Sequence, residues 1–226
     1  MSFNNGPTIV TSGLVLALDA GDRNSYVSGS TTWFDLTGVN NGTLTNGPTF
    51  NTGSGGSIVF DGVDDYLLLS NVTSSTTGFT WDFWMNLDTV QPSNPNFWCY
   101  LYGFNNSTVE IGVYNSGSLV NSLGFVNYDN APTRPYLSVS SSLGSWVNVT
   151  LGCDNLIPFM YSNGGNYITT TAFQNLNLPV ANLFRSQAYG GRYLKGKFAN
   201  FKIYNRALSA QEVLQNYNAT KGRFGL

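Results

Sequence analysis

The clearest pattern of apolar and polar residues lies in the segment Phe79–Leu87, where the two kinds of side chain alternate. One face would carry Phe79, Trp81, Phe83, Met85 and Leu87, and the other would carry Thr80, Asp82, Trp84 and Asn86. A period of two is the repeat of an extended chain, whose successive side chains point to opposite faces of a sheet. The segment therefore predicts a half-buried antiparallel β-strand.

Short apolar segments recur along the chain and are separated by turn-forming residues. The strongest are 14–18, 58–60, 66–69, 109–114, 146–151 and 159–161. Asp61-Gly62 and Asn163-Gly164 are pairs that favour the tight turns of β-hairpins. Repeated short strands of this kind predict an all-β sandwich, and 226 residues suit one such domain. We expect the polar residues 1–12 to form an N-terminal arm and residues 13–226 to form the domain.

One helix is predicted near the end of the chain. Ser209 and Glu212 have the spacing of a capping box, in which each side chain accepts a hydrogen bond from the other residue's backbone N–H. Leu208 and Val213 can pack together across this helix start, and Gly222 suits the helix end.

The composition excludes several functions. The chain has no histidine, which removes His-based zinc sites and catalytic triads. Charged residues make up 10% and the net charge is −2, so the basic face that nucleic-acid binding requires is not expected. Two cysteines, Cys99 and Cys153, do not form a disulfide framework. We expect two free, largely buried thiols, and a single bridge between them is the alternative.

The N-terminal residues show no basic region followed by an apolar stretch, so no signal peptide is expected. No apolar run approaches the length of a membrane span, so no membrane partner is expected either. These features predict a protein made in a cytoplasm.

Two motifs carry a family resemblance. They are Phe60-Asp61-Gly62-Val63-Asp64-Asp65-Tyr66 and the run GKFANFKIYNRALSAQEV at 196–213, with LALDAGD at 16–22 and WVNVTLGCDNLIPFMYSNGG at 146–165 in support. Together they resemble the laminin-G-like members of the concanavalin A-like lectin/glucanase superfamily. The resemblance implies a jelly-roll β-sandwich of two antiparallel sheets, with the short C-terminal helix added to it.

The resemblance also implies a range of functions. The family includes adhesion modules, carbohydrate-binding modules and structural proteins of tailed phages, and LALDAGD with NATKGRFGL at 218–226 looks most like the phage group. We expect a non-catalytic virion protein, either a capsid decoration or a fibre or spike component. Its partners would be other virion proteins, copies of itself, or host surface glycans during attachment. A cellular or secreted carbohydrate-binding or adhesion module is the alternative.

Aromatic residues are the candidate contacts for a glycan or a protein partner. Trp84 falls on the polar face of its strand, and Trp98, Tyr100 and Tyr102 follow a proline-containing loop. Flat rings beside polar groups suit both sugars and protein interfaces. We expect Trp33, Trp81 and Trp146 to fill the core instead.

Aspartates are the candidate metal ligands. Asp19, Asp35, Asp61 and Asp64 lie at turns, and carboxylates with backbone carbonyls suit a structural calcium ion. Their spacing matches no calcium loop, so turn formation by aspartates bonding to their own backbone is favoured. No cofactor other than this ion is expected.

A glycosidase site is not expected. Retaining hydrolysis needs two carboxylates about 5–5.5 Å apart, and the glucanases of the superfamily carry them on one strand as E-x-D-x-x-E. No such stretch occurs here: Glu110 stands alone in a strand, and Glu212 belongs to the helix cap. The protein is therefore predicted not to be an enzyme.

Overall fold

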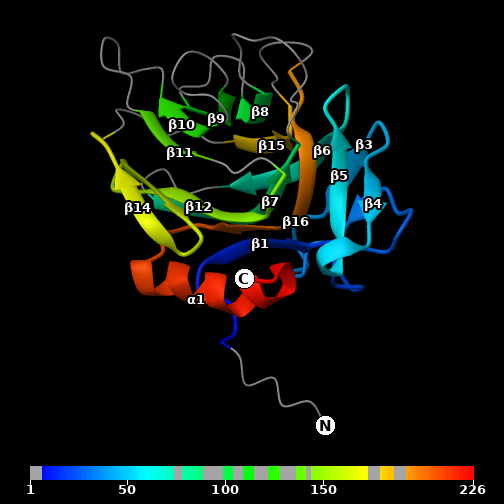
Figure 1. The fold of residues 1–226 in the computed structure, drawn as a ribbon, viewed down its shortest axis with the longest axis horizontal. Helices are drawn as coiled ribbons and strands as arrows, with labels where there is room; N and C mark the ends of the chain where they lie inside the picture. Colours follow the sequence, from blue (N-terminus) through cyan, green and yellow to red (C-terminus); the bar gives the residue numbers. More distant parts are fainter. Residues whose placement is uncertain are drawn as a thin grey trace.

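The computed structural model describes residues 7–73, 78–88, 99–103, 109–114, 122–127, 136–140, 144–172, 179–185 and 192–226. These residues form two packed layers of antiparallel strands with one α-helix outside them (Figure 1).

The larger layer is a single sheet of eight strands. In spatial order it contains β14 (Gly165–Thr169), β13 (Ile157–Ser162), β12 (Val147–Asp154), β7 (Gly78–Leu87), β16 (Lys195–Tyr204), β5 (Ser57–Asp61) and β4 (Thr49–Asn51). The eighth strand, β1 (Leu14–Asp19), pairs with the second half of β16, whose first half pairs with β5. A register shift between Phe198 and Asn200, where β16 pairs with β7, lies between these two halves.

The opposite layer consists of two four-stranded parts. One part contains β11 (Tyr136–Ser140), β10 (Ser122–Asn127), β9 (Val109–Tyr114) and β8 (Cys99–Gly103). The other contains β15 (Pro179–Leu183), β6 (Tyr66–Thr73), β3 (Gly42–Thr45) and β2 (Thr32–Trp33), with β15 beside β8. The predicted jelly-roll sandwich is confirmed, with its second sheet interrupted between β8 and β15.

The main core lies between the two layers. It is built from the inward-facing residues of β7 and β16, where the Phe83 and Phe201 rings stack at 5.3 Å and Trp81 meets Phe201 edge-on at 5.5 Å. Trp33, from the opposite layer, is also fully buried, as the sequence predicted for both tryptophans. Cys153 of β12 is a free thiol in this core, and burial raises its pKa.

The predicted half-buried character of Phe79–Leu87 is wrong. The strand β7 is central in its sheet, and its outward-facing Thr80, Asp82 and Trp84 are buried as well. Polar side chains are tolerated there because they pair: Asp82 accepts from Asn148 Nδ2 at 2.7 Å and forms a buried ion pair with Lys202 at 3.5 Å. Alternation of apolar and polar residues therefore identified the strand but not the layer that covers its polar face.

That covering layer is the C-terminal segment, α1 (Ala210–Thr220) followed by the 3₁₀ helix η2 (Lys221–Phe224) (Figure 1). The capping box of Ser209 and Glu212 is present, and Leu208 and Val213 are both buried beside the helix start, as predicted. The helix does not stop at Gly222: the chain continues into η2, and Gly225 takes the left-handed conformation. None of the helices in the described ranges combines the length and hydrophobicity needed to cross a bilayer.

The start of the described chain is attached to this helix. Val10 N donates to Asn216 Oδ1 at 2.8 Å, Val10 O accepts from the Tyr204 hydroxyl at 3.0 Å, and Thr8 O accepts from Gln215 Nε2 at 2.7 Å. The predicted arm of residues 1–12 is therefore corrected, because residues 8–12 are part of the packed domain. Residues 1–6 lie outside the described residues.

Candidate functional site

Trp84 does not lie on an accessible surface. Its ring is fully buried and stacks on Tyr217 at 5.8 Å and on Phe224 at 4.0 Å between centroids, and its Nε1 donates to Thr220 Oγ1 at 2.8 Å. The prediction that Trp84 contacts a glycan or partner is wrong, because the C-terminal segment encloses the ring. Trp146, expected in the sandwich core, instead contacts Phe224 at 4.9 Å on this outer side.

The other predicted aromatic contacts are not described at the level of side chains. Trp98 lies outside the described residues. For Tyr100 and Tyr102 the structure gives the backbone in β8, where they pair with Gly112 and Ile111 of β9. Their contact role stays a prediction.

The four predicted calcium ligands are not brought together. Asp61 and Asp64 lie in the loop between β5 and β6, where their carboxylates and that of Asp65 come within 4.8 Å of one another. The hairpin predicted from Asp61-Gly62 is wrong, because β5 belongs to the larger sheet and β6 to the opposite layer. Backbone N–H groups of this loop bond to the cluster, since Asp65 Oδ2 accepts from Asp61 N at 2.9 Å and Asp61 Oδ1 accepts from Val63 N at 2.7 Å. Burial, with the charges of Asp61 and Asp64, raises the pKa of Asp65. The contacts within this loop agree with the turn-forming interpretation.

Asp35 and Asp19 have other partners. The buried Asp35 carboxylate accepts from Ala17 N at 2.8 Å, from Asn40 N at 2.9 Å and from Thr37. Burial alone would raise its pKa, but these hydrogen bonds outweigh burial and lower it. Asp19 forms an ion pair with Arg223 at 2.6 Å. The predicted set of four is therefore corrected: Asp35 holds the loop after β2, and Asp19 holds the C-terminal segment.

Glu212 belongs to the helix cap, as the sequence predicted. Glu212 is held by Arg206 at 2.6 and 2.9 Å, and this contact lowers the pKa of Glu212 to about 2. A carboxylate that stays ionised and paired cannot act as a general acid near neutral pH. Glu110 lies in β9, where the structure describes the backbone.

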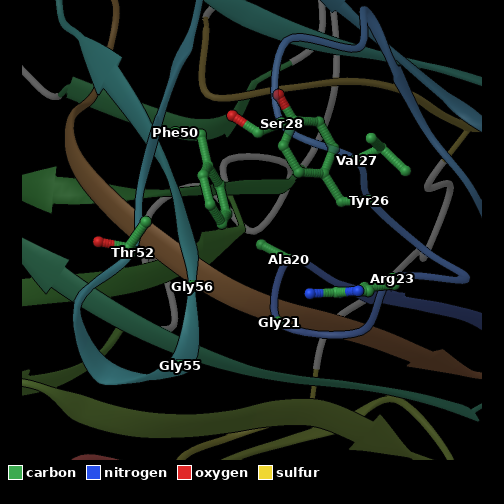
Figure 2. Close-up of a pocket in the computed structure, with 10 residues that line it drawn as sticks. All are labelled: Ala20, Gly21, Arg23, Tyr26, Val27, Ser28, Phe50, Thr52, Gly55 and Gly56. Carbon is green, nitrogen blue, oxygen red and sulfur yellow. The ribbon is translucent and has the colours of Figure 1, made fainter.

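The structure also shows a groove at the edge of the sandwich, which the sequence did not predict. It consists of two adjoining hollows of about 500 and 440 Å³, which share Tyr26, Ser28 and Phe50, and we call it the Tyr26 groove. The first hollow, the Arg23 lobe, lies between the β1–β2 loop and the turn after β4, and is lined by Ala20, Gly21, Arg23, Val27, Thr52, Gly55 and Gly56 in addition (Figure 2). The second, the Asn46 lobe, extends toward Asn46, Pro48 and Thr49.

The loop after β1 is fixed by hydrogen bonds close to the groove. The backbone N–H groups of Ser25 and Tyr26 donate to Asp22 O at 2.9 and 2.8 Å, and the Ser25 hydroxyl donates to Phe34 O at 2.6 Å. Tyr26 is mostly buried, its hydroxyl donates to Ser30 O at 3.2 Å, and its ring meets Phe50 at 5.3 Å between centroids. The aromatic wall is therefore held in place by its own loop.

Arg223 supports the Arg23 lobe from behind. Its guanidinium donates to Asp19 at the end of β1, to Ser54 O at 2.6 Å, and to Gly56 O. These partners belong to the two loops that form the lobe. The two loops come closest at Gly21, where only glycine fits: a Cβ at that position would collide with Gly55 O. The C-terminal segment thus sets the distance between the two walls.

The groove has the chemistry of a small-molecule or sugar site. Figure 2 shows Tyr26 and Phe50 on two sides of the hollow, with the hydroxyls of Ser28 and Thr52 and the guanidinium of Arg23 at its margin. Ring faces with a few polar groups are the usual lining of a ligand pocket, and the combined volume is in the range of such pockets. No pattern in the sequence could show that the loop after β1 and the turn after β4 face one another.

Solved structures share this fold at low sequence identity. Domain 4 of AbnA, a GH43 extracellular arabinanase from Geobacillus stearothermophilus solved with arabinotriose, has a TM-score of 0.65 and 17% identity over 92% of this chain and 100% of that chain. The binding domains of botulinum neurotoxin serotype D and of Paraclostridial Mosquitocidal Protein 1 each have a TM-score of 0.69, with 14% and 17% identity over 91% and 92% of this chain. The chain spans about half of these toxin binding domains, 51% and 52%.

Sequence comparison gives the family. No curated protein sequence matches the chain. The family model for the concanavalin A-like lectin/glucanases superfamily, of the laminin G type, matches residues 61–214, well over half of the chain. This match shows that the chain belongs to the concanavalin A-like lectin/glucanase superfamily, and the jelly-roll sandwich agrees with it.

Proposed function

We propose that the protein is a non-catalytic glycan-binding domain carried on the particle of a tailed phage, where it serves host attachment. The observation that carries the glycan-binding part is the Tyr26 groove, in which Tyr26 and Phe50 line both lobes beside hydroxyls. The hydroxyls of Ser28 and Thr52 form no hydrogen bond with other described residues, so both can bond to a ligand. The arabinanase domain, which was solved with a bound arabino-oligosaccharide, supports the same class of ligand.

The non-catalytic part is supported by the carboxylates. Glu212 is ion-paired with Arg206, Asp19 is ion-paired with Arg223, and Asp35 accepts hydrogen bonds from the loop after β2. The Asp61 cluster lies in the loop between β5 and β6, outside both lobes. No acidic side chain lines the Tyr26 groove among its described residues. A sugar bound there would meet no general acid and no carboxylate nucleophile.

The binding experiment uses a glycan array followed by calorimetry on any glycan that binds. We expect Phe50→Ala to abolish binding, because it removes one face of the groove. Tyr167→Ala is the matched control, since Tyr167 is an exposed aromatic on β14 outside both lobes. Both variants should keep a folded-state melting transition. If no glycan binds the intact protein, or if Phe50→Ala binds as well as the wild type, the proposal is refuted.

The virion location is supported by the resemblance of the 16–22 and 218–226 motifs to phage proteins, and mass spectrometry of purified particles tests it. In the assembly form of this proposal, the N-terminal residues pack on the shell or on copies of the protein. Because Thr8 and Val10 are bonded to α1, the informative deletion is residues 1–6 alone. Loss of incorporation with unchanged glycan binding would support assembly through these residues.

A cellular or secreted carbohydrate-binding module is the second candidate. It is favoured by the arabinanase domain, which this chain covers along its whole length. Recovery of the protein from cell walls or culture medium, and not from particles, would select this candidate and reject the virion location.

A further inference from the structure

The two lobes of the Tyr26 groove differ in charge. Arg23 is the one charged residue among the described residues that line either lobe. The Asn46 lobe is lined instead by neutral residues, including Thr31, Leu44, Asn46 and Thr49. A ligand that spans both lobes therefore meets a cation at one end and neutral polar and apolar groups at the other.

Arg23 is not used by the fold. It is exposed and makes no hydrogen bond or ion pair with the described residues. The nearest acids in sequence are engaged elsewhere, since Asp19 pairs with Arg223 and Asp22 accepts from Asn24 N at 2.8 Å. In Figure 2 the guanidinium of Arg23 lies below the Tyr26 ring, across the hollow from Thr52. Arg23 therefore does not hold the loops together; Arg223 does so, through hydrogen bonds to three partners in the same loops.

The chemistry of a guanidinium selects its partner. Its fork of N–H donors matches a carboxylate in a bidentate geometry, and such charge-assisted hydrogen bonds are stronger than those between neutral groups. Ring faces and hydroxyls in the same lobe suit the remainder of a sugar ring. The two lobes lie within residues 20–56, before the region that the family model matches.

We infer that the groove takes an acidic oligosaccharide, with the carboxylate of one sugar at Arg23 and a neutral sugar in the Asn46 lobe. This inference rests on the proposed glycan binding and specifies its ligand class. The neutral sugar gains contacts from Phe50 and Pro48, and the carboxylate decides between otherwise similar glycans.

The test uses acidic glycans and their carboxyl-reduced counterparts, which replace the carboxylate by an alcohol and keep the rest of the molecule. Sialyllactose and oligogalacturonates, each with its reduced form, are titrated into the intact protein by calorimetry. We expect at least one acidic member to bind about tenfold or more tighter than its reduced form. Arg23→Gln should remove this preference, and Arg23→Lys should retain part of it, since it keeps the charge but loses the fork.

The control variant is Lys197→Gln, which changes the net charge equally but lies on β16 outside the groove. It should keep the full preference. If reduced and acidic forms bind the wild type equally and Phe50→Ala still abolishes binding, the inference is overturned while the proposed function stands. If Arg23→Gln keeps the preference, the carboxylate is not read by Arg23 and the inference is also overturned. If none of these glycans binds the protein and no glycan on the array binds it, the inference and the proposed function fail together.

Discussion

Replacing Arg223 by alanine should weaken both the fold and the groove. Arg223 donates to Asp19 at 2.6 Å, to Ser54 O at 2.6 Å and to Gly56 O, and so joins the end of β1, the turn after β4 and the C-terminal segment. Its side chain is 19% exposed and that of Asp19 is 29% exposed, so water can partly replace the lost contacts. Charge-assisted hydrogen bonds contribute about 1.5–3 kcal/mol each when buried, whereas exposed ion pairs contribute about 0.2–1 kcal/mol. We therefore expect a total loss of about 2–3 kcal/mol.

Thermal unfolding measures this loss directly. For a domain of this size each kcal/mol lowers the melting temperature by about 2–4 °C, so Arg223→Ala should melt about 4–12 °C below the wild type. Arg23→Ala is a matched control, because it removes an exposed arginine that has no partner among the described residues, and it should change stability by less than about 0.5 kcal/mol. Equal melting temperatures for the two variants would refute the inference that Arg223 fixes the loops.

Three further predictions concern the fold. Trp84→Ala should cost about 3–5 kcal/mol, measured by denaturant unfolding, because it leaves a cavity between Tyr217 and Phe224; a cost below about 1 kcal/mol would contradict the buried placement. The contact with Arg206 lowers the Glu212 pKa, so this pair stabilises the protein above the ordinary value of 4.5 and loses its contribution as pH falls to about 2. Glu212→Gln should lose about 1 kcal/mol at pH 7 and little at pH 2. Calcium and chelators should leave the melting temperature unchanged, since backbone N–H groups of the β5–β6 loop bond to Asp61 and Asp65; a saturable rise that Asp64→Asn abolishes would establish a structural ion there.

Local sequence signals predicted the elements of this fold well. The capping box at Ser209 depends on residues three apart, and the Asn163-Gly164 turn joins the paired strands β13 and β14 directly. Alternation identified β7 because the period of an extended chain is visible within one segment. Each of these features is decided by neighbours in the sequence.

The candidate site could not be predicted in the same way. Trp84 is covered by Phe224, and no pattern in β7 shows that a residue so distant in the chain will pack on its polar face. Tyr26 and Phe50 belong to separate loops, and Arg223 fixes those loops from the other end of the chain. Such contacts depend on tertiary packing, which the alternation of side chains does not encode.

The most direct test of the account is to map where a glycan binds. Amide NMR shifts of ¹⁵N-labelled protein can be followed during titration with a glycan that calorimetry shows to bind. The account predicts that the largest shifts lie in residues 20–31 and 46–56, around Tyr26 and Phe50. Shifts concentrated on other strands, with these two loops unchanged, would contradict the assignment of the Tyr26 groove as the glycan site.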